Sequence, residues 1–502
     1  MQTARSGFFS GVNPALTSVS ILLVAATSIV GATMLGQDSA VMAFLRNNVI
    51  SALNVYYIPL VAFFLVFTLA MLVTRFGRIK LGDDDDEPDF TTFTWFAMLF
   101  SCGMGIGLVF WGVAEPMFHF QSNPFMDESA AMSAEAQQLA MRITFLHWGL
   151  HPWATYVIIG LTLAYFSYRK KMPLTFRSAL YPIFGEATKG FLGSVIDLIA
   201  VFATVIGVAT SLGLGVQQLN TGLNQLIGLP VSTNMQVALV IGITIVATLS
   251  VVTGLGRGIK YLSLINLVLS IVVLTLIFVL ANPVELVVEF FTNTGDYLVN
   301  VFPLSIWIDS GNWQDGWTTF YWAWWIAWSP FVGMFIARVS RGRTIREFIF
   351  GVLFMPAGVA FIWLTIFGNT AMDVETNIGG LADAVSNDIT LALYSMFSLM
   401  DVGVLGSTLA ILITILIFTY FVTSADSGTL VVTTILAGGN LNPPVLQRIL
   451  WGAGTGILAG ALLLGGGLSA LQTASISAAL PFSIVMLFMI LGLVKTLLQE
   501  PR

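Results

Sequence analysis

The stretch FYWAWWIAW, residues 320–328, decides how the rest of this chain is interpreted. It lies in an apolar run, residues 316–337, that contains no charged residue. Trp322, Trp325 and Trp328 recur every third residue, so they form one stripe if the run is helical. Tryptophan in membrane proteins usually lies in the interfacial belts. An indole stripe in mid-span indicates a binding site for a ligand that favours aromatic faces, and quaternary ammonium groups are such ligands.

The composition is that of an integral membrane protein. Of 502 residues, 57% are hydrophobic and only 9% are charged, whereas soluble domains carry about 25% charged residues. Only apolar helices or closed barrels cross lipid, and the long continuous apolar runs indicate helices. The single cysteine, Cys102, excludes an internal disulfide and a multi-cysteine metal site. We expect an all-α membrane protein that is not an enzyme, holds no resident cofactor and binds no nucleic acid.

Windows of about 20 residues predict twelve transmembrane helices, and the first helix has no cleavage pattern of a signal peptide. The spans cover residues 14–36, 51–75, 92–117, 138–168, 191–217, 234–256, 260–282, 316–338, 345–369, 403–435, 446–467 and 474–498.

The distribution of basic residues supports this topology. With twelve spans, both termini and the even-numbered loops share one side. That side holds all of the 20 Lys and Arg residues except Arg46 and Arg142. The positive-inside rule makes this side cytoplasmic. We therefore expect a multi-pass protein of the cell membrane, in contact with its lipid, with both termini in the cytoplasm.

The third predicted span contains glycines at positions 103, 105 and 107. A period of two suits no helix face, and each glycine costs about 1 kcal/mol of helix propensity relative to alanine. One interpretation is close packing of helices through small residues. The other is a locally unwound helix whose backbone groups contact a ligand, as in transporters with discontinuous helices.

The fourth predicted span contains HWGLHPWATY, residues 147–156. Pro152 predicts a kink in this helix. We interpret His147 and His151 as hydrogen-bonded core histidines rather than metal ligands, because the sequence shows no third ligand beside them.

Two further features depend on charge. Residues 283–301 mix apolar and acidic side chains, which predicts an amphipathic helix at the outer interface. Glu115 and Asp426 lie inside predicted spans, and intramembrane carboxylates are functional candidates by default. A gate or capping role suits Glu115, whereas Asp426 could support an ion site or carry a proton.

Five motifs together resemble the betaine/choline/carnitine transporter family, from about residue 10 to the last span. They are GMGIG (103–107), HWGLHPW (147–153), GWTTFYWAWWIAWSPF (316–331), RVSRGR (338–343) and TSADS (423–427).

The resemblance implies a LeuT-like fold with two inverted five-helix repeats, spans 3–7 and 8–12, and a homotrimer. The predicted topology agrees with the inversion, because span 3 runs outward and span 8 runs inward. The resulting segments are a cytoplasmic N-terminus (1–13), two peripheral helices (14–91), the first repeat (92–282), the interfacial helix and loop (283–315), the second repeat (316–498) and a cytoplasmic C-terminus (499–502).

The resemblance also implies a substrate site. An aromatic box encloses the ligand, with backbone groups of the unwound third span at its end and Trp328 at the next step of the path. The implied binding residues are Trp148, Trp153, Tyr156, Trp325, Trp328, Gly103, Met104, Gly105 and Gly107.

Two sodium sites of the family can be transferred by position. The first corresponds to Ser101, Met104, Tyr420, Thr423 and Ser424, an oxygen-rich set that suits a hard cation. The second corresponds to Thr204 and Phe331, but its later threonine position is Val208, which offers no oxygen. The second site is therefore in doubt.

The expected function is import of a small zwitterionic or cationic methylammonium compound by sodium symport with alternating access. Glycine betaine is favoured over trimethylamine N-oxide, dimethylsulfoniopropionate or carnitine. The alternatives within the family are a sodium-independent exchanger of carnitine or betaine and a proton-coupled choline transporter. The short segments outside the first and last spans predict little regulation by osmotic stress.

Overall fold

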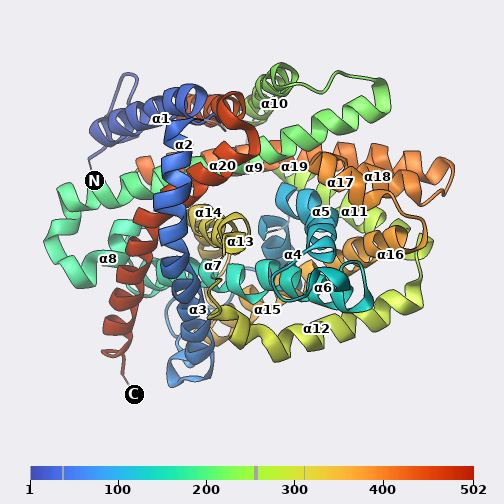
Figure 1. Cartoon of the computed structure of the whole chain (residues 1–502). Helices are drawn as coiled ribbons and strands as arrows, with labels where there is room; N and C mark the ends of the chain where they lie inside the picture. The colour runs from blue at the N-terminus through green and yellow to red at the C-terminus, as the bar shows by residue number, and fades with distance from the viewer. Residues whose placement is uncertain (1, 37–38, 104, 254–257, 310, 502) are drawn as a thin grey trace.

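The computed structural model describes residues 2–36, 39–103, 105–253, 258–309 and 311–501. Within these ranges the protein is all-helical, and its only β-type pairings are two isolated bridges (Figure 1). This confirms the predicted all-α class.

The helices of the first half follow the apolar runs. They are α1 (Pro14–Met34), α2 (Ala40–Phe44), α3 (Ser51–Val73), α4 (Thr92–Gly103), α5 (Ile106–Gln121), α6 (Ala134–Trp148), α7 (Leu150–Ala164), α8 (Phe176–Phe184), α9 (Phe191–Ile227), α10 (Thr233–Thr253) and α11 (Gly258–Leu280).

The second half begins with the helix predicted at the interface. Its helices are α12 (Pro283–Ser305), α13 (Trp313–Gly316), α14 (Thr318–Arg338), α15 (Ile345–Leu364), α16 (Thr370–Asn377), α17 (Leu381–Asn387), α18 (Ala392–Leu399), α19 (Val404–Leu436) and α20 (Val445–Leu497).

Several of these helices are suited to cross a membrane. Among the described residues, seven are long and apolar enough to do so, which supports a multi-pass membrane protein. The third and fourth predicted spans are not among the seven, because each is divided into two helices of 12 to 16 residues. The number of twelve spans stays a prediction.

Glycine marks the division inside the longest helical stretch. The range of α20 covers 53 residues, but Gly467 lies inside it with a φ of 58°. This left-handed conformation favours glycine. The division falls at the predicted boundary between residues 446–467 and 474–498.

α14 lies at the centre of the molecule (Figure 1). It packs against α3, α7, α9 and α20, and every residue from Thr318 to Met334 is buried. A helix that is apolar on all sides is buried on all sides, so the tryptophan-rich sequence explains this central position.

α12 confirms that residues 283–301 form an amphipathic helix. It buries Leu286, Tyr297 and Val301 and packs along α6 (Figure 1). Asp296 on α12 accepts two hydrogen bonds from the guanidinium of Arg142 on α6. One of the two basic residues that the topology leaves on the outer side is thereby paired.

Candidate functional site

The helix break predicted in the third span is present. α4 ends at Gly103, α5 begins at Ile106, and Gly105 between them is extended (φ −158°, ψ −161°). Met104 and the side chain of Ser101 lie outside the described residues. The predicted helix break is therefore present, Gly107 beyond it also packs closely against Trp324 as the alternative expected, and the ligand contacts stay a prediction.

The fourth span is also broken, but not at Pro152. The break is at Gly149, between α6 and α7, and Pro152 lies in the first turn of α7, where proline is tolerated. Proline has no N–H, so the helical hydrogen bond from residue 152 to the Trp148 carbonyl cannot form. The helix is therefore interrupted in the turn before Pro152. Leu150 N–H donates instead to the Tyr297 hydroxyl of α12, at 3.1 Å.

Four of the predicted box residues form a chain of nearly perpendicular rings. The ring centroids of Trp148 and Trp325 lie 5.0 Å apart at 72°. Tyr156 meets Trp325 at 6.4 Å and 82°, and Trp153 meets Tyr156 at 5.4 Å and 83°. All four side chains are buried. Rings that meet edge to face turn their faces in different directions, as the walls of a cage do, so the arrangement is compatible with the predicted aromatic box.

Indole hydrogen bonds fix the orientation of the walls. Trp325 Nε1 donates to the His147 carbonyl at 3.0 Å, close to the break at Gly149. Trp328 Nε1 donates to the Gly207 carbonyl of α9 at 2.9 Å, and its ring meets Phe331 at 5.4 Å. Each indole therefore has one defined orientation in the buried site.

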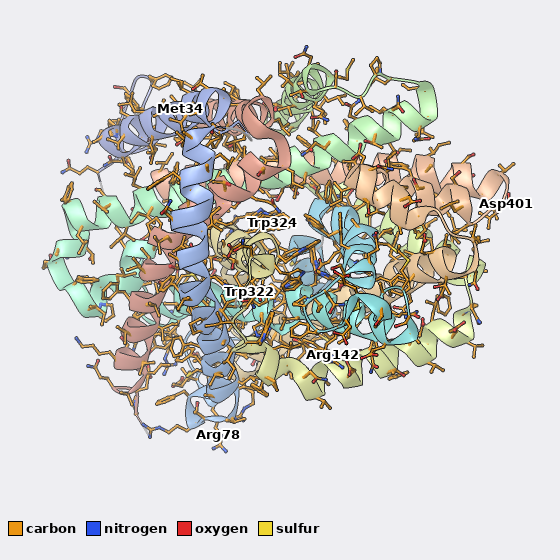
Figure 2. The ribbon with its side chains drawn as sticks, in the orientation of Figure 1. Met34, Arg78, Arg142, Trp322, Trp324 and Asp401 are labelled. Atoms are coloured by element: carbon orange, nitrogen blue, oxygen red, sulfur yellow. The ribbon has the colours of Figure 1, made fainter. Side chains whose placement is uncertain are left out.

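The remaining tryptophans of the motif support the box from behind. Trp324 stacks on Trp325 at 4.8 Å and 15°, and Trp322 stacks on His151 at 5.0 Å. Both are 1% exposed, and Figure 2 shows them near the centre of the molecule. Trp322 thus belongs to the core, although its spacing places it in the stripe with Trp325 and Trp328.

Gly107 brings the backbone of α5 close to two tryptophans of the candidate site. A Cβ atom at this position would lie 2.6 Å from Trp324 Cη2 and 3.1 Å from Trp148 Cη2. At Gly105 the nearest atom, Trp328 Cη2, would be 3.9 Å away, an ordinary contact. The absence of a side chain at Gly107 therefore lets the backbone approach the aromatic walls.

A buried cluster around Glu115 was missed by the sequence analysis. Its Oε2 accepts from Trp148 Nε1 at 2.7 Å and from the Tyr321 hydroxyl, and its Oε1 lies 2.6 Å from His147 Nδ1. Glu115 and His147 are fully buried. The sequence offered one signal of this cluster, the spacing of Glu115 and His119, which lie one turn apart on α5. The other members come from α6 and α14, and sequence spacing does not show that they lie nearby.

Both ring nitrogens of His147 have hydrogen-bond partners, as predicted, whereas His151 has a partner at Nε2 and none among the described residues at its buried Nδ1. His147 Nε2 lies 2.9 Å from Thr318 Oγ1, and His151 Nε2 lies 2.7 Å from Ser305 Oγ. The premise that no third ligand accompanies His147 was wrong, because donor atoms of Glu115, His119 and His147 lie within 4.8 Å of one another. Glu115 and His147 are engaged with protein partners, so the cluster is a hydrogen-bond network.

Three residues of the first predicted sodium set, Tyr420, Thr423 and Ser424, lie on α19, and two of them contact α11. Tyr420 hydroxyl pairs with Ser270 Oγ at 2.9 Å, and Thr423 Oγ1 accepts from Asn266 Nδ2 at 3.1 Å. Thr423 Oγ1 also lies 3.1 Å from two backbone carbonyls of its own helix. A hydroxyl has two lone pairs, so one remains for a cation. Ser424, the next residue, is half-buried, so the chemistry of these hydroxyls suits sodium, and the site itself stays a prediction.

The second predicted sodium set fits less well. Thr204 Oγ1 donates to the Ala200 carbonyl at 2.7 Å, which leaves its lone pairs available. Val208, one turn later, packs against α19, since a Cβ atom on Gly428 would lie 2.7 Å from Val208 Cγ2. Phe331 offers a ring and no oxygen. The residues present supply one side-chain oxygen, which disfavours a complete second site.

Comparison with known proteins gives the same family over nearly the whole chain. Residues 15–502 match the model of the BCCT, betaine/carnitine/choline family transporter. A probable glycine betaine transporter of Desulfitobacterium hafniense (strain Y51) is 44% identical over 468 residues, 91% of this chain and 93% of the relative.

Two further relatives are similarly close. The glycine betaine transporter OpuD of Bacillus subtilis (strain 168) is 46% identical over 453 residues, 89% of this chain and 87% of the relative. A glycine betaine/proline/choline transporter of Vibrio parahaemolyticus serotype O3:K6 is 42% identical over 505 residues, 97% and 90% of the two chains. With this match and the tryptophan-lined site at its centre, the chain belongs to the betaine/carnitine/choline family of transporters.

Proposed function

We propose that this protein imports a zwitterionic methylammonium compound, glycine betaine first, by sodium symport. The observation that carries the substrate class is the chain of perpendicular rings formed by Trp148, Trp325, Tyr156 and Trp153. A desolvated cation–π contact contributes up to about 2 kcal/mol. Several such walls therefore bind a quaternary ammonium group well without a direct ion pair.

The extended backbone at Gly105 supports a zwitterion rather than a simple cation. Freed N–H groups at a helix break can bind a carboxylate, and Gly107 places no acidic side chain in the box. We expect betaine to bind more tightly than choline in isothermal titration calorimetry of the purified protein. Tighter binding of choline would overturn the substrate assignment. Three relatives whose names include glycine betaine support the same choice.

The coupling ion is proposed from the α19 set. Thr423, Ser424 and Tyr420 provide oxygens beside the break that follows Gly103 in the family's arrangement. Uptake into proteoliposomes should require a sodium gradient, and the double variant Thr423→Ala/Ser424→Ala should lose either that requirement or transport. Unchanged uptake without sodium or a proton gradient would contradict symport.

Val208 favours a second candidate function, a sodium-independent exchanger, because it offers no oxygen ligand at a position of the second sodium site. Exchange makes a distinct prediction, because uptake would then depend on substrate preloaded inside the vesicles and not on sodium. Uptake of choline into proteoliposomes under an inward proton gradient, measured in the same way, tests the proton-coupled alternative.

The transport cycle is proposed to use two inverted repeats, residues 92–282 and 316–498, that alternate the access of the box between the two sides of the membrane. We further propose a homotrimer with cytoplasmic termini. Mass measurement of the detergent-solubilised protein and protease accessibility of tagged termini in sealed vesicles test these two points separately.

A further inference from the structure

Glu115 is bonded to Trp148, one of the four rings of the proposed box. It donates nothing to the box itself, and instead its Oε2 accepts the indole N–H of Trp148 at 2.7 Å. The same oxygen accepts the hydroxyl of Tyr321, whose ring stacks on Trp325 at 5.9 Å and 26°. One carboxylate is therefore bonded to two aromatic side chains that contact Trp325.

The two hydrogen bonds that Oε2 of Glu115 accepts suit an ionised carboxylate. Trp148 Nε1 can only donate, and Tyr321 donates to the same oxygen. His147 Nδ1 lies 2.6 Å from the other oxygen, and His119 Nε2 lies 3.5 Å from it. A buried carboxylate is stable only where such donors replace water. No Lys or Arg pairs with Glu115 among the described residues, so its charge is not cancelled by a fixed cation.

An anion at this position acts on the faces of the rings. An indole or phenol that donates a hydrogen bond to an anion gains electron density on its π-face, and the attraction of that face for a cation increases. The carboxylate also attracts the cation directly through a region of low dielectric, where charges interact strongly. Both effects require a charged ligand and vanish for a neutral one.

The geometry points to Glu115 as the fixed counter-charge of the aromatic box. It acts through Trp148 and Tyr321 to select a quaternary ammonium group over a neutral group of the same shape. It is a positioning and specificity-determining residue that does not touch the substrate. This inference rests on the proposed methylammonium substrate and adds to it the source of the discrimination by charge.

The test compares glycine betaine with 3,3-dimethylbutanoate, which replaces the quaternary nitrogen with carbon and keeps the shape and the carboxylate. Both are titrated against the parent and Glu115→Gln in the purified full-length protein. We expect Glu115→Gln to weaken betaine binding about tenfold, the effect of about 1.4 kcal/mol, and to change binding of the carbon isostere by less than about twofold. Glu135→Gln, on an exposed turn of α6, is the matched control and should change neither.

A purely structural role predicts a different result. If Glu115→Gln weakens both ligands equally, or neither, the inference is wrong. If the variant does not fold, Tyr321→Phe decides, because it removes one donor and leaves the carboxylate. The preference for betaine over the isostere must then fall, but not vanish, because Trp148 still donates to the carboxylate, and an unchanged preference would refute the inference. Failure of the parent to bind any methylammonium compound would overturn the proposed function instead.

Discussion

At the residue scale, the site consists of tryptophans whose roles differ although their sequence environment is uniform. Trp325 and Trp328 donate to backbone carbonyls and line the proposed path, whereas Trp322 and Trp324 pack behind them. The distinction follows from hydrogen bonds and ring angles, which only the packed structure supplies. Substitutions of single tryptophans therefore have unequal expected effects.

Trp325→Leu should weaken substrate binding well over tenfold. The change removes the ring that meets both Trp148 and Tyr156, and a desolvated cation–π wall contributes about 2 kcal/mol. Trp307→Leu is the matched control, since Trp307 is half-buried and its ring meets Phe125 at 4.5 Å and 51°, outside the predicted box. The measurement is the dissociation constant of the substrate for each variant by calorimetry. Equal effects of the two substitutions would contradict a binding role of Trp325.

Gly107→Ala should weaken binding more than Gly105→Ala. The added methyl group at Gly107 would lie 2.6 Å from Trp324 and must displace Trp324 or Trp148, whereas at Gly105 it makes an ordinary contact at 3.9 Å. Overpacking of this kind costs about 1–3 kcal/mol. The ratio of the two dissociation constants is the measurement. A larger loss at Gly105 would show that the backbone conformation there matters more than the approach to the rings.

At the element scale, helix ends carry the site. The breaks at Gly105 and Gly149 place backbone groups beside aromatic rings, and α12 contacts the second break. α12 is itself held by acidic residues in a polar contact with α6 and α16. Gln137 Nε2 lies 3.2 Å from Glu289 Oε1 and 3.4 Å from Asp373 Oδ1.

The attachment of α12 should weaken as pH rises. Burial, opposed by a hydrogen bond from Asn369 and reinforced by Asp373 and Glu285, raises the pKa of Glu289 to about 7. Burial and Glu285 raise the pKa of Asp373 to about 6. Both values exceed those of the free groups, so the folded state binds these protons more tightly. Its stability falls as pH rises from about 4 to 7.

Glu289→Gln should flatten this dependence. We expect the thermal midpoint of the parent in detergent to fall by about 1–3 °C more than that of the variant between pH 5 and pH 8. Asp373→Asn should flatten the curve over a lower pH range. Parallel curves for parent and Glu289→Gln would contradict the assignment of the titrating group.

At the scale of the whole molecule, ion pairs connect the loops predicted to be cytoplasmic. Asp83, Asp84 and Asp86 pair with Lys171, Arg169 and Arg341, and Glu500 pairs with Arg169 and Lys170. The acidic run that follows α3 thus contacts the segments after α7 and α14. Movements of the two proposed repeats relative to each other must rearrange these pairs.

The proposed sodium coupling belongs to this scale because its candidate residues lie on α9, α14 and α19. With Val208 in place of an oxygen ligand, the sodium dependence of uptake should have a Hill coefficient near that of a single bound ion. Val208→Thr adds a hydroxyl of nearly the same shape and should raise the apparent sodium affinity or steepen the curve. Val205→Thr, buried on the same helix, is the control. If Val208→Thr leaves the sodium dependence of uptake unchanged, no sodium ion binds at this position.

The sequence predicted what depends on local pattern. The helices, the amphipathic α12 and the break near Gly105 follow from hydropathy and glycine spacing. It did not predict the network of Glu115 or the pairing of α11 with α19 through Asn266 and Ser270. These depend on which faces of distant helices meet, and a single polar residue in an apolar run does not indicate its partner. The sequence placed the break of the fourth span at Pro152, three residues after its actual position at Gly149. The reason is local, because proline disrupts the helical turn that precedes it.

α12 contacts the start of α7, which carries two residues of the proposed box, and other side chains of α12 are exposed on the surface. Tyr297 accepts from Leu150 N–H, and Ser305 pairs with His151, while Phe291, Leu298 and Phe302 on α12 stay exposed. An amphipathic helix takes its position from the depth of the surrounding headgroups. We therefore expect bilayer thickness and headgroup composition to influence the proposed aromatic box, so that affinities measured in nanodiscs of defined lipids differ from those measured in short-chain detergent.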